Sequence, residues 1–205
     1  MLENVFYINL KHRKDRKRHV ENELNKLGWK YERFNAIKNK DGRLGCSMSH
    51  LKLLEMAKTK QLEYIVIIED DIEFKNHKLY NEKLNRFFNK KIDYDVLMIA
   101  GNIRKPIEFL DNETMRIKKS FTTTGYIVKQ NYYDKLINNI KRGVNGLIRY
   151  PGIKGKFEID VNWFELQAND TWLLLYPRTV SQMKDYSDIE KTTVSYEHLM
   201  LDNIK

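Results

Sequence analysis

Three consecutive carboxylates, Glu69, Asp70 and Asp71, directly follow the apolar run 65–68. Ligands of open α/β sheets bind outside the carboxyl ends of the strands, so these acids stand where chemistry is expected. Side chains of an extended strand alternate between its faces, which predicts Glu69 and Asp71 on one side and Asp70 on the other. Carboxylates this close repel one another, and Mn²⁺ or Mg²⁺ takes oxygen ligands of this kind. We therefore predict a metal site at Asp71 and Glu69. Asp71 and Glu73 also share a face, so Asp71, which belongs to both pairs, is the preferred metal ligand. The alternative is a strand end whose acids face solvent and cap the following turn.

Predicted strands and helices alternate along the first half of the chain, and they must position these acids. Short runs rich in β-branched and aromatic residues predict strands, and longer runs with apolar residues at helical spacing predict helices. The predicted strands cover 5–10, 29–34, 64–68 and 95–100, and the predicted helices cover 14–27 with Gly28 as its stop, a segment that begins near Ser47, and 78–88. This rhythm predicts βαβ units and a mainly parallel sheet with helices on both faces.

The pattern is less regular after residue 102. We predict a hairpin around 111–113, a strand over 124–128, a helix near 131–141, a loop over 143–157, a short helix over 159–167 and a strand over 171–177. The last residues, 185–205, are polar with scattered aromatics and predict a tail or a lid. The expected fold class is α/β, in a single domain over 1–205 with a nucleotide-binding half (about 1–102) and a less regular acceptor-side half (about 103–184).

Composition and charge exclude several classes of protein. The 205 residues carry a net charge of +9, which suits nucleic acid, anionic lipid or a phosphorylated small molecule, but also a solvated lysine-rich surface. A single cysteine, Cys46, excludes an intramolecular disulfide and a multi-cysteine metal site. No apolar run approaches the ~20 residues that cross a bilayer. The N-terminus places its charges after its apolar run, the wrong order for a signal peptide. We expect a soluble, cytoplasmic protein.

Several separated segments share the order and spacing of one family. They are YINLKHRKDR (7–16), FNAIKNKDG (34–42), GCSMSHLKLLEMA (45–57), IVIIEDDIEF (65–74), TTTGYIVKQNYYDKLI (122–137), IDVNWF (159–164) and YPRTVSQ (176–182). Together they resemble glycosyltransferase family 25, the lipopolysaccharide-biosynthesis and procollagen galactosyltransferase-like family, over nearly the whole chain. The resemblance implies a GT-A-like, Rossmann-type fold, a nucleotide-diphosphate-sugar donor, a divalent metal at the acidic motif, and sugar transfer with inversion at the anomeric carbon.

The resemblance also implies donor contacts. Asn9 and Arg13 match the family's first motif and would contact the nucleotide or diphosphate, for which a guanidinium is a good shape. Arg16 lies in the same motif, but it fits a solvated helix face equally well. Asn35 and Ala36 follow the second predicted strand, where this architecture places contacts to base or ribose.

Further matches lie in and after the predicted second helix. Gly45 would allow close backbone approach at the start of a helix whose N-terminus favours anions. His50 matches the GC…SH motif and would contact donor or acceptor, unless it is a core histidine with satisfied hydrogen bonds. Asp70, on the side away from the metal, would face ribose or sugar, and Cys46 fits a small buried residue better than a nucleophile.

The candidate catalytic base comes from the second half of the chain. An inverting transfer needs a carboxylate that takes the proton of the acceptor hydroxyl, and Asp160 matches the family's acid near its C-terminal helix. A helix N-cap is the alternative role for Asp160. Gln182 matches another family position, with no independent physical argument for its role.

The sequence thus predicts a metal-dependent inverting glycosyltransferase. It would move a hexose, galactose or glucose, from a UDP-sugar to a hydroxyl of a glycan, lipopolysaccharide or collagen-like protein, with Mn²⁺ or Mg²⁺ as cofactor. One alternative is a basic nucleic-acid-binding or nucleotidyl-processing protein, but the basic cluster 11–19 lacks interleaved aromatics, so we expect no nucleic-acid partner. An inactive homologue that serves as an interaction module is the other alternative. Peripheral membrane association and the oligomeric state stay open.

Overall fold

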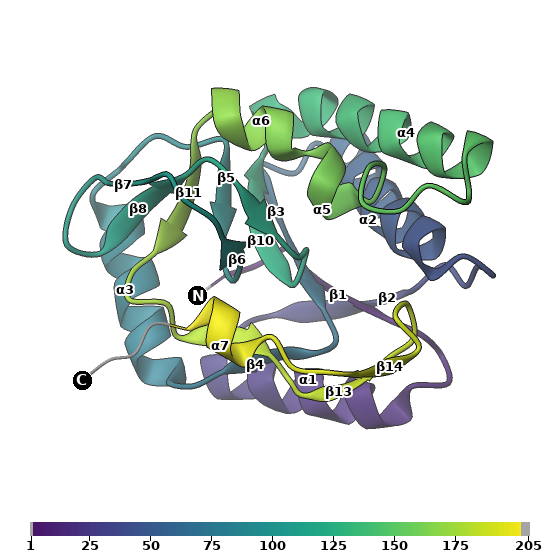
Figure 1. Cartoon of the computed structure of the whole chain (residues 1–205). Helices are drawn as coiled ribbons and strands as arrows, with labels where there is room; N and C mark the ends of the chain where they lie inside the picture. The colour runs from purple at the N-terminus through teal and green to yellow at the C-terminus, as the bar shows by residue number, and fades with distance from the viewer. Residues whose placement is uncertain (1, 202–205) are drawn as a thin grey trace.

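An eight-stranded sheet forms the centre of the molecule in this computed structural model, which describes residues 2–201 (Figure 1). From one edge to the other the strands are β2 (Tyr31–Asn35), β1 (Val5–Asn9), β3 (Tyr64–Glu69), β10 (Gly125–Lys129), β5 (Val96–Met98), β11 (Trp172–Leu175), β8 (Thr114–Ile117) and β7 (Ile107–Phe109). Strands β10 and β8 are antiparallel to their neighbours, and the other strands share one direction. The carboxyl ends of β1, β2 and β3 therefore meet at one edge.

Helices α1 (Lys14–Leu27) and α3 (His77–Asn89) cover one face of the sheet. The α1 residues Val20 and Leu24 pack with Tyr7 of β1, and Phe87 of α3 lies in the same buried cluster. Gly28 ends α1 with φ 69°, and its N–H reaches the carbonyls of Leu24 and Asn25. That is the left-handed position for which glycine has no steric penalty, so the predicted helix and its stop are confirmed.

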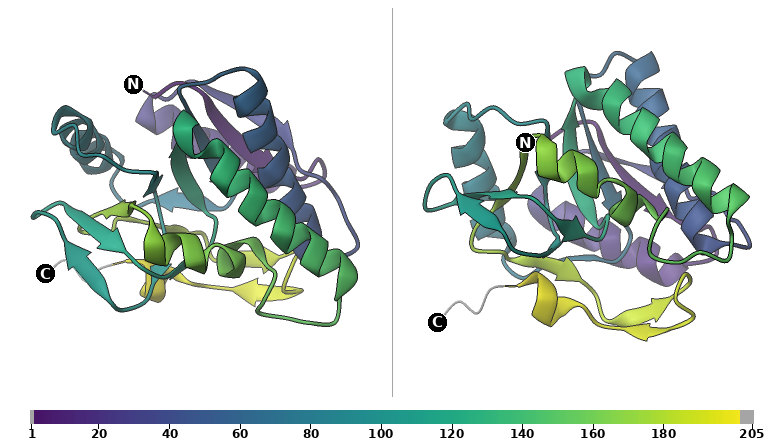
Figure 2. Two further views of the ribbon diagram at one scale, coloured as in Figure 1. Left: turned by 90° about the horizontal axis from the view of Figure 1, so that it is seen from above. Right: turned by 45° about the horizontal axis from the view of Figure 1, so that its top comes forward.

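Helices α2 (Gly42–Thr59) and α4 (Tyr133–Arg149) lie side by side on the other face (Figure 2). Two short helices, α5 (Ile159–Asn162) and α6 (Phe164–Asn169), extend this layer. Trp163, between them, packs edge-on against Tyr126 and Trp172. Burial of large aromatic side chains of this kind stabilises a fold by about 1.5–3 kcal/mol each. The expected fold class, α/β with a mainly parallel sheet and helices on both faces, is confirmed.

Two helix boundaries differ from the sequence predictions. Helix α2 begins at Gly42, not near Ser47, because the Asp41 side chain accepts a hydrogen bond from the Arg43 N–H (3.0 Å) and caps the first turn.

Helix α4 runs to Arg149, through the first part of the predicted loop 143–157. Its glycines make room for a neighbour rather than breaking the helix. A Cβ on Gly143 would lie 2.8 Å from the Phe157 carbonyl oxygen, and one on Gly146 would lie 2.2 Å from Cδ1 of Phe157.

The predicted hairpin around 111–113 is confirmed as β7 and β8. The other peripheral strands pair in two-stranded sheets: β4 (Ile72–Phe74) with β12 (Val180–Gln182), and β6 (Asn102–Ile103) with β9 (Ser120–Phe121). The 3-10 turn η1 (Gln130–Tyr132) joins β10 to α4.

The C-terminal segment is ordered over the described part of the predicted tail. Strands β13 (Asp185–Ser187) and β14 (Thr192–Val194) form a hairpin beside α1, and α7 (Glu197–Met200) packs against β12 and β6 (Figure 1). The end of that predicted tail, 202–205, lies outside the described residues. Among the helices described, none combines the length and the apolar character that a membrane span requires.

Candidate active site

The three acids lie at the carboxyl edge of the sheet, where strand β3 ends. Glu69 is the last residue of β3, and Asp70 and Asp71 form the turn to β4. Side chains therefore alternate between the two faces of the sheet only as far as Glu69. Arg16 Nη1 lies 3.1 Å from Asp70 Oδ1 and 3.1 Å from Asp71 Oδ2, so these two carboxylates face the same guanidinium. Asp70 is grouped with Asp71 and does not point to the opposite side, contrary to the sequence expectation.

The carboxyl groups of Asp70 and Asp71 carry raised pKa values. Burial raises the pKa of the Asp70 carboxyl, although Arg16 and Asn9 act in the opposite direction. Burial, and next the negative charge of Glu69, raise the pKa of the Asp71 carboxyl well above its ordinary value. The single guanidinium of Arg16 therefore does not cancel the effects of burial and of neighbouring negative charge on Asp70 and Asp71.

Asn9 ties the end of β1 to this turn. Its side-chain amide donates to Asp70 Oδ2 (2.6 Å) and to the Arg13 carbonyl (3.0 Å), and its Oδ1 accepts from Arg33 Nε (3.0 Å). Asn9 is buried, so each polar atom of its side chain has a protein partner. Its side chain therefore lies next to Asp70, and its predicted contact with the nucleotide or diphosphate stays a prediction.

Arg13 and Arg16 do not form a solvated helix face. The Arg16 guanidinium also donates to Asp185 Oδ2 (2.9 Å) and to the Tyr186 carbonyl (3.1 Å) of the β13–β14 hairpin. Arg13 pairs with Asp185 and with Asp188 Oδ2 (2.9 Å) of the same segment. Arg16 therefore connects the acidic turn to the C-terminal hairpin, and Arg13 holds the same hairpin beside the start of α1.

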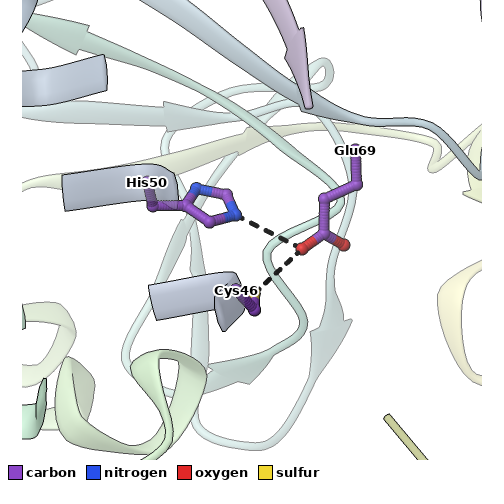
Figure 3. A group of neighbouring side chains, drawn as sticks. All are labelled: Cys46, His50 and Glu69. Carbon is purple, nitrogen blue, oxygen red and sulfur yellow. Dashed lines mark hydrogen bonds and ion pairs between the residues drawn. The ribbon is translucent and has the colours of Figure 1, made fainter. Parts of the chain in front are cut away.

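Glu69 faces α2 rather than Arg16. Its Oε1 atom accepts from Thr123 Oγ1 (2.7 Å) and lies 3.3 Å from His50 Nε2 and 3.6 Å from Cys46 Sγ. Figure 3 shows the imidazole and the thiol converging on this carboxylate from one helix face. Burial raises the pKa of the Cys46 thiol well above its ordinary value, which suits a half-buried hydrogen-bonding residue and not a nucleophile.

Asp160 is the second residue of α5, and it does not cap that helix. Glu158 holds the N-cap position, while Asp160 Oδ2 accepts from the Thr122 backbone N–H (3.1 Å). Burial raises the pKa of the Asp160 carboxyl, and the charge of Glu69 acts in the same direction. The two carboxylates are thus close enough to interact.

The segment 122–124 joins these two acids. Thr122 donates to Asp160, Thr123 donates to Glu69, and the Thr124 carbonyl accepts from the Glu69 N–H (2.9 Å). Thr122 has φ 72°, a conformation that β-branched residues rarely adopt. Local strain of this kind concentrates at functional sites.

The remaining predicted residues lie around the cluster. Gln182 Nε2 is 3.4 Å from Asp71 Oδ1, and Asn35 is exposed at the end of β2. Ala36 is half-buried, and its N–H donates to the Asn9 carbonyl (3.0 Å).

Gly45 does permit a close approach, but to its own chain, because a Cβ there would lie 2.5 Å from the Ile37 carbonyl oxygen. It lies inside α2 and not at the N-terminus of that helix, which Asp41 already caps. The structure therefore gives no support to an anion site at Gly45.

Sequence reasoning missed Thr123, Asp185 and Asp188 as site residues. The run of threonines at 122–124 and the acids of the polar tail were the available signals. A cavity of about 1000 Å³ lies elsewhere, at the opposite edge of the sheet, where Tyr64 begins β3; its lining includes Trp29 and Phe88. The acid cluster does not line that cavity.

Comparisons with known proteins bear on this arrangement. The sequence model described as "Glycosyltransferase family 25 (LPS biosynthesis protein)" matches residues 2–43 and 40–148. A Drosophila melanogaster "Glycosyltransferase 25 family member" is 25% identical over 86% of this chain and 33% of its own length. "Procollagen galactosyltransferase 1-A" of Xenopus laevis is 22% identical over 66% of this chain and 28% of its own length. The chain thus spans about a third of the length of these relatives.

Solved structures with a related outline share little sequence. A mannose-1-phosphate geranyltransferase from Thermus thermophilus has a TM-score of 0.48 at 8% identity and covers 83% of this chain and 72% of its own. A UDP-glucose pyrophosphorylase complexed with UDP-glucose has a TM-score of 0.46 at 12% identity, with 84% and 72% covered. The sequence match carries the assignment: because the family model covers well over half of the residues, this chain belongs to glycosyltransferase family 25.

Proposed function

We propose that this chain is a metal-dependent inverting glycosyltransferase, which moves a hexose from a UDP-sugar to a hydroxyl of a glycan, lipopolysaccharide or collagen-like protein. The observation that carries the proposal is the group of four carboxylates at the carboxyl edge of the sheet, of which Asp70 is buried and Glu69, Asp71 and Asp160 are half-buried. Removing several carboxylates from water costs free energy, and groups of this kind in proteins are often found at functional sites. Membership of the family and the Xenopus relatives named procollagen galactosyltransferases support galactose as the sugar.

The acids fit a hard divalent cation, Mn²⁺ or Mg²⁺. Asp71 and Glu69 are oxygen donors, and the pKa of Asp71 is raised first by burial and next by the negative charge of Glu69, which Arg16 does not fully offset. Asp71 would hold the cation, with Glu69 beside it. A bound cation would offset the charge of the diphosphate leaving group.

Asp160 is the proposed base. Its raised pKa suits proton transfer near neutral pH better than an ordinary carboxyl, because base catalysis is most efficient when the pKa is near the working pH. The Thr122 N–H holds one of its oxygens and leaves the other for an acceptor hydroxyl. The acceptor would thus enter from the side of α5.

Asn9, Arg13 and Arg16 are the proposed donor contacts, with Asn35 and Ala36 for base or ribose. The guanidinium groups pair with Asp185 and Asp188 of the hairpin as well as with Asp15, Asp70 and Asp71, so a diphosphate must compete with these carboxylates. We propose that the hairpin acts as a lid whose acids yield when the donor binds. A lid is one of the two roles predicted for residues 185–205, and its contacts would be those of Asp185 and Asp188 with the two arginines.

A panel of sugar nucleotides tests the proposal. The protein is incubated with Mn²⁺ and each donor, and nucleotide release and thermal stabilisation are measured with and without EDTA. We expect a UDP-hexose to give both responses, and we expect EDTA and Asp71→Asn to abolish the release. Asp134→Asn, the same change at an exposed carboxylate of α4, is the matched control. If no donor responds, or if Asp71→Asn behaves as Asp134→Asn does, the proposal is wrong.

A further inference from the structure

The side chain of His50 does not reach the surface of the molecule, yet it lies next to Glu69 of the acid cluster. It is fully buried in α2, with Nδ1 2.8 Å from the Tyr126 hydroxyl and Nε2 3.3 Å from Glu69 Oε1. A buried imidazole with a partner at each nitrogen cannot reach a donor or an acceptor. A direct contact with substrate, one of the roles implied for His50 by the resemblance, therefore does not suit its place in the fold.

The hydrogen bonds set the direction of this chain of groups. Glu69 accepts at Oε1, so the imidazole presents Nε2–H to it. In the neutral ring Nδ1 is then the acceptor, and the Tyr126 O–H donates to it (2.8 Å). The Tyr126 ring stacks on the imidazole at 5.6 Å and packs edge-on against Trp163, so neither group has room to rotate. The result is a rigid line from Tyr126 through His50 to Glu69.

All the side-chain contacts of Glu69 fall on one oxygen. Thr123 and Cys46 point at the same Oε1 as His50, and no hydrogen bond from residues 2–201 reaches Oε2. A carboxylate fixed at one oxygen by several donors presents its second oxygen in a defined direction. Partners of this kind that orient a metal-binding carboxylate typically contribute 10–100-fold in affinity or activity.

We propose that His50 is a positioning residue, which together with Thr123 fixes Oε1 of Glu69 so that Oε2 is the atom offered to the cation. This inference rests on the proposed function, because it needs a cation beside Asp71 and Glu69. It adds the group that aims Glu69 and a division of labour between the two oxygens of one carboxylate. The Cys46 thiol is a weak third donor in this arrangement, at 3.6 Å.

The same three side chains suggest a competing arrangement. Cys46, His50 and Glu69 offer atoms that lie within 4.8 Å of one another, a spacing that a softer ion such as Zn²⁺ could bridge. The hydrogen bonds already give each group a partner, which favours positioning. The two arrangements differ in whether sulfur binds a metal, and a spectrum can distinguish them.

The experiment uses pairs of variants that differ in one donor. His50→Gln keeps an N–H at the position of Nε2, whereas His50→Phe keeps a ring without a donor. Thr123→Ser and Thr123→Val form the second pair, in case His50→Phe fails to fold. Mn²⁺ affinity is measured on the protein without donor, from the electron paramagnetic resonance signal of free Mn²⁺, and thermal unfolding is recorded for every variant.

We expect His50→Phe and Thr123→Val to weaken Mn²⁺ binding by roughly 10–100-fold, and the donor-retaining partners to recover most of it. Equal affinity in the folded members of a pair would overturn the inference while Mn²⁺ binding by the wild type stands. Wild-type protein that binds no Mn²⁺ would overturn the inference and the proposed function together. An intense sulfur-to-metal absorption band with Co²⁺, lost in Cys46→Ser, would instead assign a metal to the cluster itself and refute positioning.

Discussion

Replacing Asp160 by Asn removes the proposed base and leaves the hydrogen bond from the Thr122 N–H in place, since the amide oxygen can accept it. A positioned general base contributes about 10²–10⁴-fold to a rate, which is about 3–5 kcal/mol of barrier at 1.36 kcal/mol per tenfold. Donor binding should stay close to the wild-type value, because Asp160 contacts neither Arg13 nor Arg16. We therefore expect turnover to fall by two to four orders of magnitude with an unchanged donor affinity.

The same substitution should stabilise the fold at neutral pH. Folding raises the pKa of the Asp160 carboxyl, so the folded state holds this proton more tightly than the unfolded chain. The stability from this group is complete below the unfolded pKa and is lost as pH rises through the raised folded value. At neutral pH the wild type therefore carries the cost of a buried charge near Glu69, and Asn does not. A higher melting temperature together with lost turnover is the expected signature.

The assay combines transfer to an acceptor, donor affinity and thermal unfolding across pH. Wild-type turnover should fall as pH drops through the raised pKa of Asp160, at a higher pH than an ordinary carboxyl would give. Asp134→Asn, at an exposed carboxylate, serves as the control for the loss of one charge. Turnover within a few-fold of the wild type in Asp160→Asn, or a lower melting temperature, would refute the reasoning and place the base elsewhere.

Three further predictions concern the metal, the hairpin and the fold. Mn²⁺ affinity should fall by up to tenfold per pH unit as pH drops below the raised pKa of Asp71, because a proton competes for that oxygen, and calorimetry at several pH values checks this. Asp185→Asn with Asp188→Asn should tighten UDP binding roughly three- to tenfold, since partly exposed pairs of this kind are worth about 1 kcal/mol; weaker binding would show that the hairpin supports the arginines. Gly146→Ala should lower the free energy of unfolding by about 1–3 kcal/mol, because its Cβ would lie 2.2 Å from Phe157. Denaturant titration measures this free energy. Gly152→Ala is the control, because a Cβ there meets open space, and it should lower the free energy of unfolding little. Equal losses of stability in the two variants would contradict the packing argument.

A helix or strand is predicted well from the sequence when the residues that determine its ends lie within the same short segment. Helix α1 is predicted to the residue because its apolar spacing and its glycine stop lie within one short segment. The start of α2 is missed because Asp41 and Gly42 form a pair typical of turns, although Asp41 serves as the N-cap. The end of α4 is missed because its glycines are helix breakers by propensity, and only the fold shows that Phe157 fills the space they leave.

The site divides in the same way. A run of acids after a buried strand is enough to predict that Glu69, Asp70 and Asp71 lie at the ligand edge. Their grouping is not predictable, since the strand ends at Glu69 and the turn brings Asp70 to the same arginine as Asp71. The pairing of Arg13 with Asp188 joins residues 175 positions apart, and no local pattern of the tail specifies such a partner.

The charges at this edge constrain how a donor could bind. Arg13 and Arg16 pair with Asp15, Asp70, Asp71 and the two hairpin acids, so the positive charge that would attract a diphosphate is already offset, although the chain as a whole is basic. A diphosphate adds negative charge to a partly buried site where Coulomb repulsion is several-fold stronger than in water. Two changes relieve that repulsion: a cation at the acids, or withdrawal of the hairpin carboxylates. A cation at the acids also attracts the diphosphate directly, because the two carry opposite charges. On the proposed function, cation and donor therefore stabilise each other's binding, and by thermodynamic reciprocity each raises the affinity of the other by the same factor.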